Sequence, residues 1–341
     1  MPVRCNVGRA LLYEVPLMRA DFPRRLNVPL TPAAGVALAR HPSHRASDVS
    51  ESRRVAVPVL PDGPAAAEER RLLDAVLAAP DDDAPRLAFA DYCDRLRDPR
   101  GAWIRAQLAD DAAEVPAEIH AAARGLFAAV SGEDLVWRRG FVETLSLAGR
   151  AFITLGPWIL RQTPLREVRL VAAQPYLGEL AAAAHLACLR TLDLRGNRIG
   201  SAGLATLSAS PHLTVDALNL ACNNLTAGDV PTLPTLRRLD LSGNALGRDV
   251  AWPKQHFDAL SLDGVGLGYD GTVRLAASGV TAESLDLGFN AVTDAGVAAV
   301  VNSPLGRGCR WLGLRGNRLT PAVREILAGF GGAVDLRANF L

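Results

Sequence analysis

The C-terminal part of the chain repeats one pattern of apolar and polar positions. Within eleven residues, apolar side chains stand at positions one, four, six and eleven, and asparagine stands at position nine. In a β-strand, positions four and six point to one side, while positions three, five and seven point to the other. The pattern therefore predicts a series of short strands. Its clearest copies are residues 189–199, 236–246, 282–292 and 309–319.

The copies follow one another at a regular spacing. Weaker copies begin at Val142, Leu165, Val215, Phe257 and Gly331, and the leucine at position six recurs every 21 to 27 residues. A period of this length is typical of a solenoid, in which each unit stacks its strand beside the next. These leucines are Leu147, Leu170, Leu194, Leu220, Leu241, Leu262, Leu287, Leu314 and Leu336.

This pattern and period resemble those of the leucine-rich repeat family. Segments after the strands, such as residues 200–207 and 293–300, carry helix starts and an apolar stripe, similar to the ribonuclease-inhibitor-like subclass. The resemblance implies an α/β solenoid of about nine units over residues 141–341, with parallel strands on the concave face and helices on the convex face. The units at Leu241 and Leu262 are only 21 residues apart, which predicts shorter or irregular convex segments there.

Position nine forms a column of asparagines. An asparagine amide can bond backbone groups of neighbouring turns that would otherwise be buried without partners. We therefore expect a structural ladder. Ala173 and Val265 interrupt the column and Arg150 replaces its first member, so local irregularity is expected there. The ladder consists of Asn197, Asn223, Asn244, Asn290, Asn317 and Asn339.

The alternation within each strand predicts a protein-binding face. Parallel strands that are covered on both sides read as continuous apolar runs, so these strands should have one side open to water. Nine strands make a concave ribbon on the order of 40 Å long, enough for a protein interface. We predict a non-enzymatic protein–protein interaction module with Trp311 and Arg315 as anchors, because aromatic residues and arginine are enriched in interface hot spots. The predicted partner-binding residues are Trp311, Arg315, Arg337, Asp286, Asp335, Asp240, Asp193 and Arg195.

Residues 65–130 show helical spacing and predict a small all-α module of four helices. Its acids, Asp81, Asp82, Asp83 and Asp91, are interpreted as helix caps in preference to metal ligands. Residues 68–109 resemble the bacterial repeat-companion domain, through an L-x-A-x-L-A-x-P-x-D-D-A-P-R-L core, an A-D-Y motif and a D-P-R-G motif. That resemblance implies association with leucine-rich repeats, and it brings neither an activity nor catalytic residues.

The segments before and after the repeats lead to different predictions for the two ends of the array. Residues 1–64 have no sustained period and carry more arginine than acidic residues, which predicts a disordered lead segment. We expect the helical module and residues 131–141 to cover the first strand, because terminal repeats need a polar cap. The last unit ends without such a cap, which predicts marginal order or self-association through the C-terminal edge.

Composition narrows the classes of function. The 341 residues carry a formal net charge of +1, whereas nucleic-acid binding needs a basic surface. No apolar run approaches the roughly 20 residues that cross a bilayer, so no membrane partner is expected. Five widely spaced cysteines favour a reducing compartment and a cytoplasmic location.

Catalytic signals are missing from the sequence. It has no G-x-S-x-G elbow, no phosphate-binding loop and no H-E-x-x-H motif, so no enzyme activity, cofactor or metal is expected. Cys222 and Cys309 lie within repeats, without a histidine nearby in sequence. The alternative is an effector-like or ligase-like enzyme subunit in which the repeats hold the substrate. Labelling of one activated cysteine by a thiol-reactive probe would favour that alternative.

Overall fold

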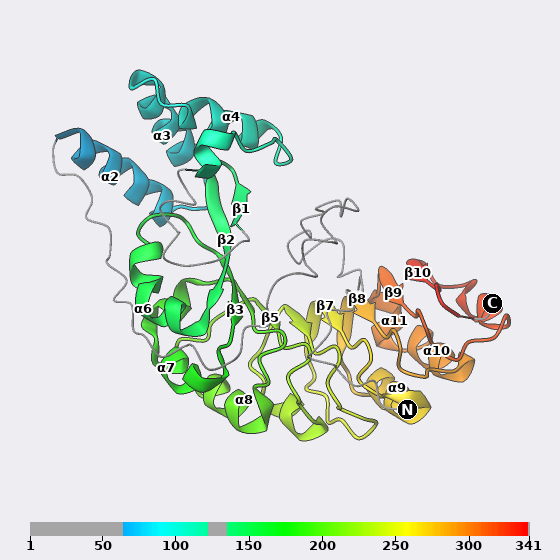
Figure 1. Cartoon of the computed structure of the whole chain (residues 1–341). Coiled ribbons are helices and arrows are strands. Elements are labelled where there is room, and N and C mark those ends of the chain that lie inside the picture. Colours follow the sequence, from blue (N-terminus) through cyan, green and yellow to red (C-terminus); the bar gives the residue numbers. More distant parts are fainter. Residues whose placement is uncertain (1–63, 122–134, 340–341) are drawn as a thin grey trace, which may run out of the picture.

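The computed structural model describes residues 64–121 and 135–339, and Figure 1 shows their arrangement. The lead segment expected over residues 1–64 lies outside the described residues except for Pro64, as does much of the expected fourth helix. The described chain begins with helices and continues as a long curved sheet. Strands line the inner side of this curve, and most helices lie along its outer side (Figure 1).

The described residues form a ten-stranded sheet in which the strands follow chain order. Strands β2 to β10 pair in parallel, one strand for each repeat, and β1 pairs antiparallel with β2. The predicted α/β solenoid is confirmed. The strands are β1 (Leu135–Arg138), β2 (Phe141–Ala148), β3 (Glu167–Val171), β4 (Thr191–Asp193), β5 (Ala217–Asn219), β6 (Arg238–Asp240), β7 (His256–Ser261), β8 (Thr281–Asp286), β9 (Trp311–Gly313) and β10 (Ala333–Asp335).

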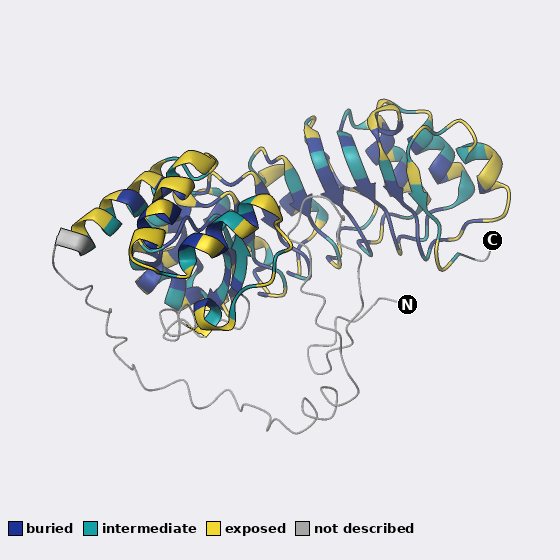
Figure 2. Ribbon diagram, turned by 90° about the horizontal axis from the view of Figure 1, so that it is seen from above, coloured by how far each residue is buried: buried dark blue, intermediate teal, exposed yellow. Residues whose placement is uncertain are grey.

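The register of the sheet brings the inward leucines together. Leu192 of β4 pairs with Leu218 of β5, which pairs with Leu239 of β6, and all three are buried. One hydrophobic cluster runs from Leu135 to Val323, so the repeats share a single interior. Figure 2 shows the strands as mostly buried, whereas the helices expose their outer sides.

Helices cover the convex side of the sheet. In α8 (Gly200–Ser208), Leu204 and Leu207 are buried against the core. The two short units depart from this form as expected: a 3-10 helix follows β5, and the described residues between β6 and β7 contain no helix. The other convex elements are α6 (Gly149–Ile159), η2 (Gln174–Tyr176), α7 (Leu177–Ala182), η3 (Ala184–Cys188), η4 (Ala227–Thr232), α9 (Gly268–Ala277), α10 (Asp294–Val301), α11 (Pro304–Gly308) and α12 (Val323–Leu327).

The asparagine column joins successive turns. The Nδ2 of Asn223 donates to the carbonyl of Leu194 in the preceding unit, at 2.9 Å. Its Oδ1 accepts the amide of Asn197 at 3.0 Å. The ladder continues past the expected interruptions, because Asn197 accepts the amide of Ala173 and Asn290 accepts the amide of Val265. A unit that lacks its own asparagine is therefore still bonded to the next unit, whose asparagine accepts its backbone amide.

The N-terminal helices pack on the first strand of the array. They are α2 (Pro64–Ala78), α3 (Asp83–Arg95) and α4 (Arg100–Ala109), and residues 117–121 are also helical. Their apolar cluster includes Phe141 of β2, so the first strand of the array contributes a side chain to the core of the helices. Asp82 caps α3 by accepting the Ala84 amide. Asp91 lies in the middle of α3 and pairs with Arg105, so it does not cap a helix as expected.

Candidate protein-binding surface

The outward positions of the strands form rows across the concave face, because the strands pair in register. Position five places Asp240 beside Ser261, Ser261 beside Asp286, and Asp286 beside Gly313. Asp193 and Asp335 stand in the same row on β4 and β10. The structure therefore brings four of the predicted acids onto one line that crosses the repeats.

The aspartates of this row also bond their own backbone. The Oδ1 of Asp286 accepts the amide of Gly288 at 2.9 Å. A carboxylate that accepts the amide two residues later stabilises the turn after the strand. These acids therefore have a structural role, and their part in partner binding stays a prediction. The other bonds join Asp193 to the amide of Arg195, Asp240 to that of Ser242, and Asp335 to that of Arg337.

Burial changes the acidity of the row. Asp240 and Asp286 are each only 2% exposed. Desolvation raises the pKa of both carboxyl groups, and the nearby Asp263 carboxylate helps to raise the pKa of Asp286 to about 6. The Gly288 amide and the Arg315 guanidinium act in the opposite direction without cancelling this effect. At neutral pH, Asp286 therefore carries a negative charge that its neighbours compensate only in part.

Arg315 spans two repeats. Its Nη2 pairs with Asp263, two units earlier, and both side chains are nine-tenths buried. The side chain crosses Gly288, where a Cβ would lie 3.1 Å from the Arg315 Cγ. The guanidinium also lies 5.4 Å from the centre of the Phe289 ring. Arg315 is thus engaged within the face, whereas Arg337 is exposed and pairs with Asp335 at 2.6 Å.

Trp311 lies against the concave face. It is half-buried and packs on Ala217 and Ala259, which stand in its row. A Cβ on Gly313 would be 2.6 Å from the Cη2 of Trp311 and 2.6 Å from the Oδ1 of Asp286. The absence of that Cβ lets the aromatic ring and the carboxylate approach each other. The face therefore presents an apolar ring beside a negative charge.

Phe289 is a surface aromatic residue that the sequence analysis did not select. It is 49% exposed, and its φ of +51° lies in the left-handed region. That conformation is unfavourable for a bulky residue, and the same position in neighbouring units is Gly264 and Gly316. The ring lies over Gly316, where a Cβ would be 2.3 Å from its Cε1. The available signal was a bulky residue at position eight, which is glycine in the two neighbouring units and glycine, alanine or cysteine in the others.

The described residues contain no group of three or more histidine, cysteine or acidic side chains that could hold a metal ion. Burial raises the pKa of both the Cys93 and the Cys309 thiols to about 11, and Cys309 donates to the carbonyl of Trp311. These two thiols are therefore not activated nucleophiles, because the thiolate is the reactive form.

The comparisons agree with the geometry. A family model described as "Leucine Rich repeat" matches residues 185–208, 232–249 and 283–301, which overlap β4 with α8, β6, and β8 with α10. No curated protein matches the chain significantly. Among the described residues, no helix combines the length and apolar character needed to cross a membrane. The stacked parallel strands and the shared leucine core agree with these matches, which identify leucine-rich repeats in three units of the solenoid.

Proposed function

We propose that this chain is a non-enzymatic protein-binding module whose partner docks on the concave face of the sheet. Leucine-rich repeats generally serve as protein–protein interaction modules, which supports this reading. The observation that carries it is the arrangement of layers, in which most helices lie on the convex side of the sheet (Figure 1). The strands present rows of polar and aromatic side chains on the other side. Such a face can bury the ~800 Å² per partner of a standard interface.

The C-terminal half of the face supplies the central contacts in this proposal. Trp311 offers an apolar ring beside the charge of Asp286, and Phe289 adds an exposed ring at the rim. Aromatic side chains that are partly ordered before binding lose little conformational freedom when a partner covers them. Arg315 supports this patch through Asp263, and the remaining predicted residues, Arg337, Asp335, Asp240, Asp193 and Arg195, extend it along the ribbon.

A pair of aromatic substitutions tests the proposal. A partner is captured with the full chain, and its affinity is measured for Trp311→Ala and for Tyr269→Ala. Tyr269 is 48% exposed on the convex helix α9 and serves as the matched control. We expect Trp311→Ala to weaken binding at least about tenfold, as for a hot-spot residue, and Tyr269→Ala to leave it unchanged. Equal affinities for Trp311→Ala and the unmodified protein contradict concave-face binding.

Three narrower proposals accompany this function. The array is of the ribonuclease-inhibitor-like subclass, the N-terminal helices form a repeat-companion domain, and the protein works in the reducing cytoplasm. The last is supported by the thiols of Cys93, Cys188 and Cys309, which form no disulfide in the described chain. Under reducing conditions such thiols stay unpaired.

We also propose that copies of the chain associate through β10. Within the described residues, no strand pairs with the outer edge of β10, and Val334 and Leu336 are only half-buried there. An open strand edge with partly exposed apolar side chains favours pairing with another chain. A protein that stays strictly monomeric at high concentration in sedimentation experiments excludes this association.

A further inference from the structure

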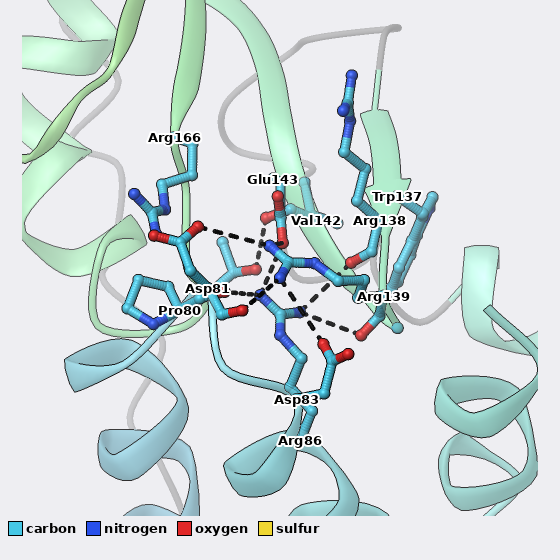
Figure 3. A network of polar contacts seen from close by, with 12 residues as sticks. Pro80, Asp81, Asp83, Arg86, Trp137, Arg138, Arg139, Val142, Glu143 and Arg166 are labelled. Atoms are coloured by element: carbon cyan, nitrogen blue, oxygen red, sulfur yellow. Dashed lines mark hydrogen bonds and ion pairs between the residues drawn. The ribbon is translucent and has the colours of Figure 1, made fainter. Parts of the chain in front are cut away.

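A second polar site lies where the N-terminal helices meet the first repeats (Figure 3). Asp81, in the turn between α2 and α3, points toward guanidinium groups from the solenoid. Its carboxylate lies 2.6 Å from Nη2 of Arg190 and 3.0 Å from Nη2 of Arg166. Arg139, in the turn between β1 and β2, approaches it at 4.0 Å. Three arginines thus converge on one carboxylate.

The repeat geometry aligns two of these arginines. Arg166 and Arg190 occupy the same position in successive units, immediately before β3 and close to the start of β4. The Arg190 amide bonds the Arg166 carbonyl at 2.9 Å, which holds the two residues in register. Neighbouring strands lie about 4.8 Å apart, so the two side chains leave the sheet side by side. Arg139 has a φ of +51° in a two-residue hairpin turn, which projects it toward the same point.

The cluster carries more positive than negative charge. Arg86 is fully buried, and its Nη2 forms an ion pair with Oε1 of Glu143 at 2.7 Å. Arg139 pairs with Glu143 at 3.1 Å and with Asp83 at 3.8 Å, whereas Arg166 and Arg190 share Asp81. The four arginines thus face three carboxylates. The Nε of Arg166 is buried and has no acceptor within the described part of the chain. A buried donor without an acceptor costs free energy, so the cluster can gain from a further anionic oxygen.

The arginine side chains of the cluster lower the pKa of Asp81. Its burial favours protonation, but Arg166 and Arg190 outweigh that effect and hold the pKa of the carboxyl below its usual value. The site is also open to solvent, because the side chains of Asp81 and Arg190 are 59% and 52% exposed. An anion from solution can therefore reach the guanidinium groups that now pair with Asp81.

We propose that Arg139, Arg166 and Arg190 form a binding site for a phosphate monoester group, and that the Asp81 carboxylate occupies this site when the phosphate is absent. Such a group carries about −1.5 to −2 charge at neutral pH and three acceptor oxygens, whereas a carboxylate has one charge and two oxygens. Arginine forks bind phosphate and carboxylate in the same bidentate manner, so the two groups can exchange. The site is separate from the concave face and does not depend on the function proposed for that face.

Titration of the full chain with phosphate tests this proposal. The probes are inorganic phosphate, a serine-phosphorylated peptide and its unphosphorylated form, each followed by calorimetry at low ionic strength. Asp81→Asn removes the competing charge, and we expect it to bind phosphate about tenfold more tightly than the unmodified protein. The combined Arg166→Gln and Arg190→Gln variant should lose at least tenfold. Arg237→Gln is the matched control, because Arg237 holds the same repeat position and pairs with Asp258 at 2.8 Å, away from Asp81.

The outcomes separate the sources of the phosphate and the roles of the arginines. Tight binding of the phosphorylated peptide with weak binding of the free ion identifies a protein-borne phosphate, and equal affinity identifies the free ion. The proposal is overturned if Asp81→Asn binds phosphate no better than the unmodified protein. It is also overturned if Arg237→Gln loses as much affinity as the double variant. Should the double variant fail to fold, the comparison of Asp81→Asn with the unmodified chain decides alone.

Discussion

Asp286 shows how the stack determines the chemistry of a single side chain. Sequence periodicity placed it on the outward side of a strand, and the structure puts it there. The sequence did not reveal that the carboxylate would be buried, or that it would bond the Gly288 amide. The same holds for Arg315, because its side chain passes Gly288 of the preceding unit, where a Cβ would crowd it. Strand periodicity predicts on which side of the sheet a side chain lies. The direction in which that side chain points along the face depends on residues more than 20 positions away.

Asp286→Asn should stabilise the protein at pH 7.5 more than at pH 4.5. The folded protein raises the pKa of Asp286 to about 6, so wild-type stability falls as pH rises from the unfolded value toward 6. Asparagine keeps the acceptor for Gly288 without this titration. We expect the stability difference between variant and wild type to grow by about 2 kcal/mol between the two pH values, measured by urea unfolding. The same difference at both pH values would show that the carboxylate is not desolvated.

Asn223→Ala should remove a central member of the ladder. It leaves the buried amides of Asn197 and Ile199 without their acceptor, and each such group costs about 1–3 kcal/mol. We expect a loss of at least about 2 kcal/mol in unfolding free energy, measured by urea denaturation. Asn302→Ala is the control, because Asn302 is exposed and its side chain bonds the Ala298 carbonyl in the same helix. A similar effect for both variants contradicts the structural role of the ladder.

Elements were predicted where the repeat is regular. The apolar spacing located the nine parallel strands, and the short interval between Leu241 and Leu262 located the segment where no convex helix forms. Strand β1 and the turn that joins it to β2 lie outside the repeat, and only a cover for the first strand was expected there. Its turn needs a positive φ at Arg139 and at Gly140, and Gly140 also approaches Ile104 so closely that a Cβ would clash. Such contacts between distant segments leave no periodic signal.

The docking of α3 on this hairpin depends on a buried ion pair. Arg86→Met leaves the buried Glu143 carboxylate without its principal partner, which should cost about 3–5 kcal/mol. Adding Glu143→Leu removes the unpaired charge, so the double variant should recover most of that loss in urea unfolding. Arg105→Met, which breaks an exposed pair with Asp91, should cost less than about 1 kcal/mol. If the double variant is no more stable than Arg86→Met, the unpaired charge of Glu143 is not the cause of the lost stability.

The whole molecule is asymmetric in how its ends are covered. The first parallel strand is paired with β1 and packed against the N-terminal helices, whereas β10 has no strand on its outer side among the described residues. The solenoid and its shared core followed from the sequence, because the position-six leucines recur with one period. The arginine cluster around Asp81 did not, because it joins a helix turn to two repeats that lie far along the chain.

Photo-crosslinking from two matched positions tests most directly whether the concave face binds the partner. A photoreactive phenylalanine replaces Trp311 on the concave face or Tyr269 on the convex helix α9, and crosslinked proteins are identified by mass spectrometry. We expect position 311 to yield one recurrent protein adduct and position 269 not to yield it. The same adduct from position 269 alone, or in equal amounts from both positions, would contradict a concave binding face.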